Sequence, residues 1–228
     1  MLKIIIGNKA YSSWSMRGWL AVKQSGLPFE EEVVSLYDEA WPARRAQPDL
    51  TPSLGKVPIL WDGDVPIWES LAIIDYLADK VGLERFWPAD PAARAFARSI
   101  ASEMHAGFAD LRNECSTNFR KTYPSKALST AAQANVDRIV HLWREALTRF
   151  GDDGRDEERG FLFGAFGAAD IMFAPVTTRF TTYRLPVPQF ALDYCRRVQA
   201  HPFMREWMDG AHAETWVIEK FESAPIEA

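Results

Sequence analysis

A proline at the start of an apolar run limits how the middle of this chain can fold. Val57-Pro58 is followed directly by Ile59-Leu60, a run typical of a buried strand. Proline has no N–H group to donate, so it can begin a central strand but cannot sit inside one. The residue before a proline is held in an extended conformation. The pattern therefore predicts a strand that begins here, with the backbone N–H and C=O of Val57 available to an extended peptide ligand.

A second polar motif follows this strand at short range. Glu69-Ser70 stands immediately before a helical pattern in which Leu71, Ile74 and Leu77 share one face. A helix start has backbone N–H groups without intrahelical partners, and these groups attract anions. The motif therefore predicts a hydroxyl, a carboxylate and free N–H groups close to one point, beside the edge that Val57 offers.

Strands and helices alternate over the first part of the chain, and only helices follow. The Asp62-Gly63-Asp64 turn indicates a hairpin, and two parallel strands before it predict a small α/β sandwich with helices on both faces. We expect an α/β domain over residues 1–82, a linker over 83–91 and an all-helical domain over 92–228. The predicted strands are 2–6, 29–34, a strand from 57 and 65–68; the predicted helices are 15–24, 40–47, 69–81, 94–120, 130–150, 168–183, 190–199 and 202–216, with a charged, glycine-punctuated loop over 151–160.

Composition excludes several classes of protein. The 228 residues are 47% hydrophobic and 25% charged, as in ordinary globular proteins. The formal net charge of −5 argues against a nucleic-acid partner, which needs a basic face. No apolar run approaches the roughly 20 residues of a membrane span, and the apolar start is too short for a signal peptide. Cys115 and Cys195 form no disulfide framework, so we expect a cytoplasmic protein.

Four short motifs, in their order along the chain, together resemble those of the soluble glutathione transferase family. Each motif is weak alone, but their spacing on an α/β half followed by a helical half is specific. The resemblance covers most of the chain and is most specific from Ser12 to Leu77. The motifs are Tyr11-Ser12-Ser13-Trp14-Ser15-Met16-Arg17, Lys56-Val57-Pro58, Glu69-Ser70 and Gly167-Ala168-Ala169-Asp170.

The resemblance implies a fold and an activity. It implies a thioredoxin-like N-terminal domain, a C-terminal helical bundle and a homodimer that transfers glutathione to an electrophilic, mostly apolar molecule. The Ser-Ser-x-Ser-x-Arg form is similar to the serine-type classes, the zeta class in particular, although Trp14 stands where that class usually has cysteine. Glutathione is then a co-substrate, and no metal is expected, because the four histidines show no metal-ligand spacing.

In this family the serine loop stabilises the glutathione thiolate. A free thiol has a pKa of about 8.5, and lowering it by two units requires about 2.7 kcal/mol in favour of the anion. A hydroxyl hydrogen bond to a charged group contributes about 1.5–3 kcal/mol and a helix start about 0.3–1 kcal/mol, so no metal or base is needed. The resemblance implies that Ser12 or Ser13 donates to the thiolate and that Ser15 assists. Loop and helix-capping roles are the alternative for all three serines.

The other motifs imply how glutathione is held. The Val57–Pro58 bond is expected to be cis, with the Val57 backbone pairing with the cysteinyl part of glutathione. Lys56 is a candidate for the glycyl carboxylate, although a solvated lysine explains it equally well. Ser70 would bind the γ-glutamyl carboxylate and Glu69 its ammonium; the alternative is an ordinary helix start. Asp170 is expected to be structural, forming half of a capping box, because Gly167 has no side chain.

The second-substrate pocket is expected between the serine loop and the helical half. A zeta-like enzyme could instead isomerise a maleyl-type diacid, or reduce peroxides, with glutathione. The isomerase would need an arginine to bind a carboxylate, but Thr182 stands at the expected position, with Arg179 about one turn earlier and Arg184 slightly later. A ligand-binding protein without catalysis is the alternative from another class. The pocket candidates are Trp14, His105, Phe108, Arg112 and Arg179.

Overall fold

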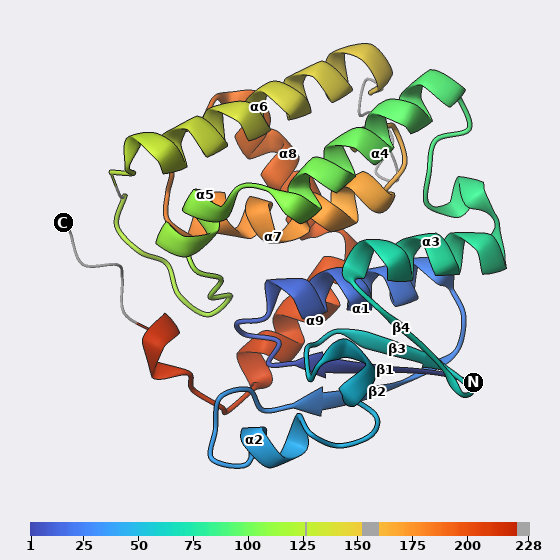
Figure 1. Cartoon of the computed structure of the whole chain (residues 1–228). Coiled ribbons are helices and arrows are strands. Elements are labelled where there is room, and N and C mark those ends of the chain that lie inside the picture. Colours follow the sequence, from blue (N-terminus) through green and yellow to red (C-terminus); the bar gives the residue numbers. More distant parts are fainter. Residues whose placement is uncertain (126, 152–159, 223–228) are drawn as a thin grey trace.

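The computed structural model describes residues 1–125, 127–151 and 160–222. Its first part is built on a four-stranded sheet with the strand order β2-β1-β3-β4 (Figure 1). β1 and β2 are parallel, whereas β1–β3 and β3–β4 are antiparallel, as the predicted hairpin requires. The α/β half predicted from the sequence is therefore confirmed. The strands are β1 (Leu2–Gly7), β2 (Phe29–Val34), β3 (Ile59–Asp62) and β4 (Val65–Trp68).

Helices cover both faces of this sheet. α1 (Ser13–Ser25) and α3 (Ser70–Val81) lie on one face, and α2 (Trp41–Arg44) lies on the other (Figure 1). β1 contributes side chains to the hydrophobic clusters on both faces of the sheet, because successive side chains of a strand point to opposite faces. Ile4 and Ile6 join the large core beneath α1 and α3, while Ile5 packs with Trp41 under α2. The continuous isoleucine run is thus explained by burial of the strand on both sides.

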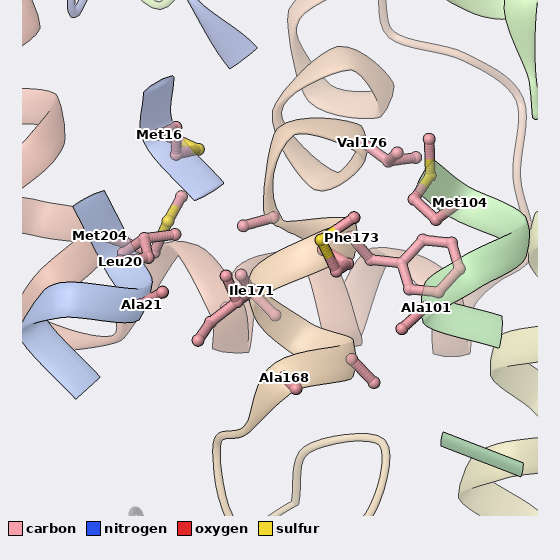
Figure 2. Packing of buried hydrophobic residues seen from close by; sticks show 14 of the residues in the cluster. Met16, Leu20, Ala21, Ala101, Met104, Ala168, Ile171, Phe173, Val176 and Met204 are labelled. Carbon is pink, nitrogen blue, oxygen red and sulfur yellow. The ribbon is translucent and has the colours of Figure 1, made fainter. Parts of the chain in front are cut away.

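The second half consists of helices arranged around α7 (Ala168–Thr182). Nearly every residue of α7 is buried, and its side chains reach α1 on one side and α4 on the other. Figure 2 shows Ile171 of α7 facing Leu20 and Ala21 of α1, and Phe173 near Met104 of α4. The two halves therefore share one core. The remaining helices are α4 (Pro91–Ala106), α5 (Ala109–Glu114), α6 (Thr130–Phe150), α8 (Gln189–Ala200) and α9 (Pro202–Ala213).

The predicted long helix over residues 94–120 is wrong. α4 ends at Ala106, and Phe108 has a left-handed backbone with φ of 60°. At Gly107 a Cβ atom would lie 2.8 Å from the carbonyl oxygen of Glu103, so the bare glycine lets the chain turn away there. The apolar periodicity continues across this break and hides it from sequence reasoning.

Other helix ends differ by smaller amounts. The helix predicted over 40–47 spans only 41–44, and the one predicted over 202–216 ends at Ala213. The loop predicted over 151–160 falls largely on residues 152–159, which lie outside the described residues. Within the described ranges, no helix has both the length and the apolar character needed to cross a bilayer.

Asp170 forms hydrogen bonds that connect the start of α7 to the preceding loop and to α8. The N–H groups of Gly167 and Leu162 donate to its carboxylate at 3.0 and 3.1 Å, and the Tyr194 hydroxyl donates at 2.8 Å. The half capping box predicted from the sequence is therefore confirmed. Burial raises the pKa of Asp170 to about 6, and the three donors oppose that rise. One carboxylate thus ties α8 and the loop before α7 to the central helix.

Candidate active site

The main cavity lies where the start of α1, residues 53–58, the start of α3 and the end of α4 meet. Its volume of about 580 Å³ is in the range of small-molecule sites. Eight residues predicted from the sequence line it: Ser12, Trp14, Lys56, Val57, Pro58, Glu69, Ser70 and His105. Motifs far apart in the sequence therefore meet at one place.

Ser12 is the N-cap of α1 and lines the main cavity. Its Oγ accepts a hydrogen bond from the Ser15 N–H at 3.3 Å. The Ser12 and Ser15 hydroxyl oxygens are 2.8 Å apart. Ser12 thus combines a hydroxyl facing the cavity with the partly positive start of a 13-residue helix.

Ser15 is fully buried and supports Ser12 from behind. Its Oγ accepts the Gly7 N–H at 2.9 Å. A hydroxyl has one proton and two acceptor positions, and the Ser15 Oγ accepts both from the Gly7 N–H and from the Ser12 hydroxyl. The Ser12 hydroxyl therefore points to Ser15 in the free protein, and it can donate to an acceptor in the main cavity by rotating about its Cβ–Oγ bond.

Ser13 has a different environment from Ser12. It begins α1 but does not line the main cavity. Its Oγ accepts a hydrogen bond from Nη2 of Arg179 at 3.4 Å. The two serines that sequence reasoning could not separate therefore lie in different places, and only Ser12 faces the cavity.

The Val57–Pro58 bond is cis, as predicted. Within the described part of the chain, neither the N–H nor the C=O of Val57 forms a hydrogen bond. Gly18 of α1 packs directly on this loop, because a Cβ atom there would lie 2.7 Å from Cγ of Pro58. The absent side chain lets the peptide edge approach the start of α1.

Glu69 and Ser70 meet the cavity at the start of α3. Glu69 has φ of 67°, an uncommon conformation for a residue with a side chain. Its carboxylate is half exposed and lies 3.4 Å from Nε2 of His105. Ser70 is buried, and its hydroxyl donates to the sulfur of Met172 at 3.8 Å, a weak acceptor. Both side chains can thus bind a charged group in the cavity.

Trp14 forms the wall beside Ser12. Guanidinium carbons of Arg17 and Arg112 lie 4.6 and 4.7 Å from its ring centroid, and His105 meets the ring edge-on at 5.3 Å. Burial lowers the pKa of His105, Glu69 opposes this effect, and the charges of Arg17 and Arg112 lower the pKa further. These surroundings therefore favour the neutral form of His105.

Three of the predicted second-substrate residues do not line the main cavity. Phe108 is buried at the break between α4 and α5, and Arg112 lies behind Trp14. Arg179 is buried, donates through Nε to the Cys115 carbonyl at 2.8 Å, and has its pKa lowered to about 10 by burial. Among the described residues, no group of three or more acidic, histidine or cysteine side chains is placed to hold a metal ion.

Sequence reasoning missed one side of the cavity. Tyr37, Trp41 and Arg45, from the segment after β2, also line it. The only signal was an unusual mix of aromatic and basic residues in that segment. Arg17 was part of the quoted serine motif, but its place behind Trp14 depends on tertiary packing.

Two family models match the chain, and both describe domains of glutathione S-transferase. The N-terminal domain model matches residues 11–80, and the C-terminal domain model matches residues 127–210. The first match contains every motif that lines the main cavity from the α/β half. The second contains α7 and Asp170.

The curated relatives match this chain over segments of very different length. Glutathione S-transferase 1 of Dianthus caryophyllus is 33% identical over 187 residues, which is 79% of each chain. Maleylacetoacetate isomerase of Rattus norvegicus is 30% identical over 101 residues, 44% of this chain and 46% of the isomerase. Dichloromethane dehalogenase of Methylophilus leisingeri is 36% identical over 64 residues, 28% of this chain. The chain thus spans only about a quarter of the dehalogenase and about half of the isomerase.

Solved structures agree over nearly the whole chain. A glutathione transferase homologue from Burkholderia, solved with bound glutathione, is 25% identical with a TM-score of 0.66, covering 92% of this chain and 98% of that chain. An epsilon-class glutathione S-transferase from Musca domestica has the same TM-score at 20% identity, which shows the fold alone. Because both halves match family models and one relative matches across most of both chains, this protein belongs to the glutathione S-transferase family.

Proposed function

We propose that this protein is a glutathione transferase whose Ser12 hydroxyl stabilises the glutathione thiolate for attack on an electrophilic, mostly apolar molecule. The observation that carries the proposal is the meeting of three features in one cavity: the Ser12 hydroxyl at the start of α1, the backbone of Val57, which pairs with no other described residue, and Ser70 at the start of α3. The Burkholderia homologue, which was solved with glutathione, supports the choice of ligand.

Stabilisation of the thiolate follows from the Ser12 environment. When glutathione binds, the Ser12 hydroxyl turns from Ser15 to donate to the sulfur, and the Ser15 hydroxyl, which accepts from the Gly7 N–H, can then donate to Ser12. A hydrogen bond to an ion contributes about 1.5–3 kcal/mol and the helix start about 0.3–1 kcal/mol. Together they supply the roughly 2.7 kcal/mol that lowers a thiol pKa by two units. The bound thiolate then attacks the electrophile at short range, where proximity supplies much of the acceleration.

The other residues that line the main cavity bind different parts of glutathione. The Val57 N–H and C=O pair with the cysteinyl backbone in the manner of an added strand. Ser70 and the free N–H groups of α3 bind the γ-glutamyl carboxylate, and Glu69 binds its ammonium. Lys56 lines the cavity, and we propose that it binds the glycyl carboxylate. The electrophile then lies on the side of Trp14 and His105, whereas Phe108, Arg112 and Arg179 shape that side from behind.

Turnover assays separate the candidate functions. Conjugation of a generic aromatic halide with glutathione is the expected result, and it consumes both reactants. Failure of this reaction, with glutathione still bound, would favour a ligand-binding protein without catalysis. Oxidation of two glutathione molecules to the disulfide, with reduction of a hydroperoxide to its alcohol and water, would identify a peroxidase instead.

Isomerisation of a maleyl-type diacid is the second candidate. The observation in its favour is that Arg179 reaches the serine loop from α7 and donates to Ser13. The matched segment of a maleylacetoacetate isomerase adds weight. Such an enzyme would convert a maleyl-type diacid to its trans isomer without net consumption of glutathione, which distinguishes it from a transferase.

Charge reversal at Glu69 tests the proposed ammonium contact. In Glu69→Lys, a cation faces the ammonium of glutathione, so KM for glutathione should rise by roughly tenfold or more, with a smaller change in kcat. Glu30→Lys on the exposed edge of β2 makes the same change in net charge away from the cavity and serves as the control. Equal KM values in wild type and Glu69→Lys would show that Glu69 does not bind the ammonium.

Assembly and location extend the same proposal. Family membership supports a homodimer, which light scattering in solution would test, with a monomeric mass as the contrary result. A cytoplasmic location is proposed on the sequence grounds given above and is testable by cell fractionation. We likewise propose a division into residues 1–82 and 92–228 joined by 83–91, which limited proteolysis between α3 and α4 would test.

A further inference from the structure

Arg17 of α1 is a fully buried cation whose hydrogen-bonding groups are mostly unsatisfied. Its side chain has no exposed surface. Nε donates to the carbonyl oxygen of Met172 at 2.8 Å. Nη1 and Nη2 are also buried, and neither has a hydrogen-bond partner among the described residues. Buried polar groups are nearly always paired, so two orphaned nitrogens on one guanidinium call for a physical explanation.

The charged groups around Arg17 do not neutralise it. Arg112 of α5 and Arg179 of α7 are both cations that lower the pKa of Arg17, although burial is the larger cause. Burial favours the neutral form of His105 of α4, and the carboxylate of Glu69, which lies beside His105, is half exposed, so water screens its charge. No carboxylate of the described residues forms an ion pair with Arg17. Because a guanidinium keeps its proton, this region of the free protein holds excess positive charge.

The excess charge lies directly behind the proposed glutathione site. The guanidinium carbon of Arg17 is 4.6 Å from the centroid of the Trp14 ring, whose indole lines the main cavity. Met172 accepts from Arg17 through its carbonyl oxygen and from Ser70 through its sulfur, so Arg17 also lies close to the start of α3. Buried charges act strongly over such distances, because little water intervenes to screen them.

We propose that Arg17 is a buried counter-charge for the glutathione thiolate, acting through its electric field from behind Trp14 and not by contact. The assignment rests on the proposed function, which puts the sulfur at Ser12. Without a bound anion the guanidinium destabilises the fold. The thiolate supplies the missing negative charge. The buried cation therefore lowers the stability of the free protein and also lowers the pKa of the bound thiol.

This assignment predicts two effects of opposite sign for Arg17→Met. Methionine fills similar space without a charge, so the variant should unfold at a higher temperature than wild type. The pKa of bound glutathione should rise by about one unit or more, a roughly tenfold loss of thiolate at a pH below both values. Arg17→Lys keeps the charge and should retain most of the lowered thiol pKa. If Arg17 served only to stabilise the fold, Arg17→Met would unfold at a lower temperature than wild type. The pKa of bound glutathione would then stay unchanged.

The experiment titrates bound glutathione by the ultraviolet absorbance of its thiolate, with thermal unfolding measured on the same variants. The control is Arg98→Met, since Arg98 also lies over a tryptophan ring, that of Trp87, but does not line the main cavity. The control should leave the thiol pKa unchanged. An unchanged thiol pKa in Arg17→Met, or a lower unfolding temperature, would overturn the role of Arg17 while leaving the proposed function intact. A wild-type protein that binds glutathione without ionising it would overturn both.

Discussion

Replacing Ser12 by alanine is expected to lower the rate of glutathione conjugation by roughly 10- to 150-fold at neutral pH. The variant loses the one hydroxyl that faces the main cavity from the start of α1. A hydrogen bond to an ionised sulfur contributes about 1.5–3 kcal/mol, and its loss raises the pKa of the bound thiol by one to two units. The deficit should therefore shrink as the assay pH rises. Steady-state kinetics from neutral to alkaline pH measure this directly.

The neighbouring serines serve as matched comparisons. Ser13→Ala should cause a much smaller loss, because Ser13 pairs with Arg179 and does not line the cavity. Ser15→Ala should have an intermediate effect, since it removes the support behind Ser12 and leaves the Gly7 N–H without its acceptor. An unaltered rate in Ser12→Ala together with a large loss in Ser13→Ala would move the catalytic role to Ser13.

Replacing Asp170 by alanine is expected to lower the free energy of unfolding by about 3–5 kcal/mol. The change leaves three buried hydrogen-bond donors without an acceptor: the N–H groups of Gly167 and Leu162 and the hydroxyl of Tyr194. Asp170→Asn should recover only part of the loss, because its amide group brings N–H donors where acceptors are needed. Urea unfolding of both variants provides the measurement.

A suitable control for this prediction is Asp137→Ala. Asp137 accepts a hydrogen bond from Gln133 on the exposed face of α6 and should be nearly neutral in stability. A loss of less than about 1 kcal/mol in Asp170→Ala would mean that the central helix does not depend on this carboxylate for its start.

The sheet and its hairpin could be predicted because their signals are local. Strand periodicity, the Asp62-Gly63 turn and the position of Pro58 each act within a few residues, and the structure agrees with all three. The break at Gly107–Phe108 was missed because apolar spacing continues through it, while the turn depends on one close backbone approach.

Which of Ser12 and Ser13 faces the main cavity could not be predicted from the sequence, for a geometric reason. Ser12 and Ser13 are adjacent in sequence, but consecutive residues at a helix start point in directions about 100° apart. Which of them faces the cavity depends on how α1 packs against β1, residues 53–58 and α7. The role proposed for Arg17 also depends on tertiary packing, because the two cations that lower its pKa, Arg112 and Arg179, come from α5 and α7.

The most direct test of the account is a crystal structure of the protein with glutathione. We expect the sulfur within hydrogen-bonding distance of the Ser12 Oγ, the cysteinyl backbone paired with the N–H and C=O of Val57, and the γ-glutamyl carboxylate at Ser70. A tripeptide bound outside the main cavity, or one whose sulfur lies out of reach of Ser12, would contradict the account.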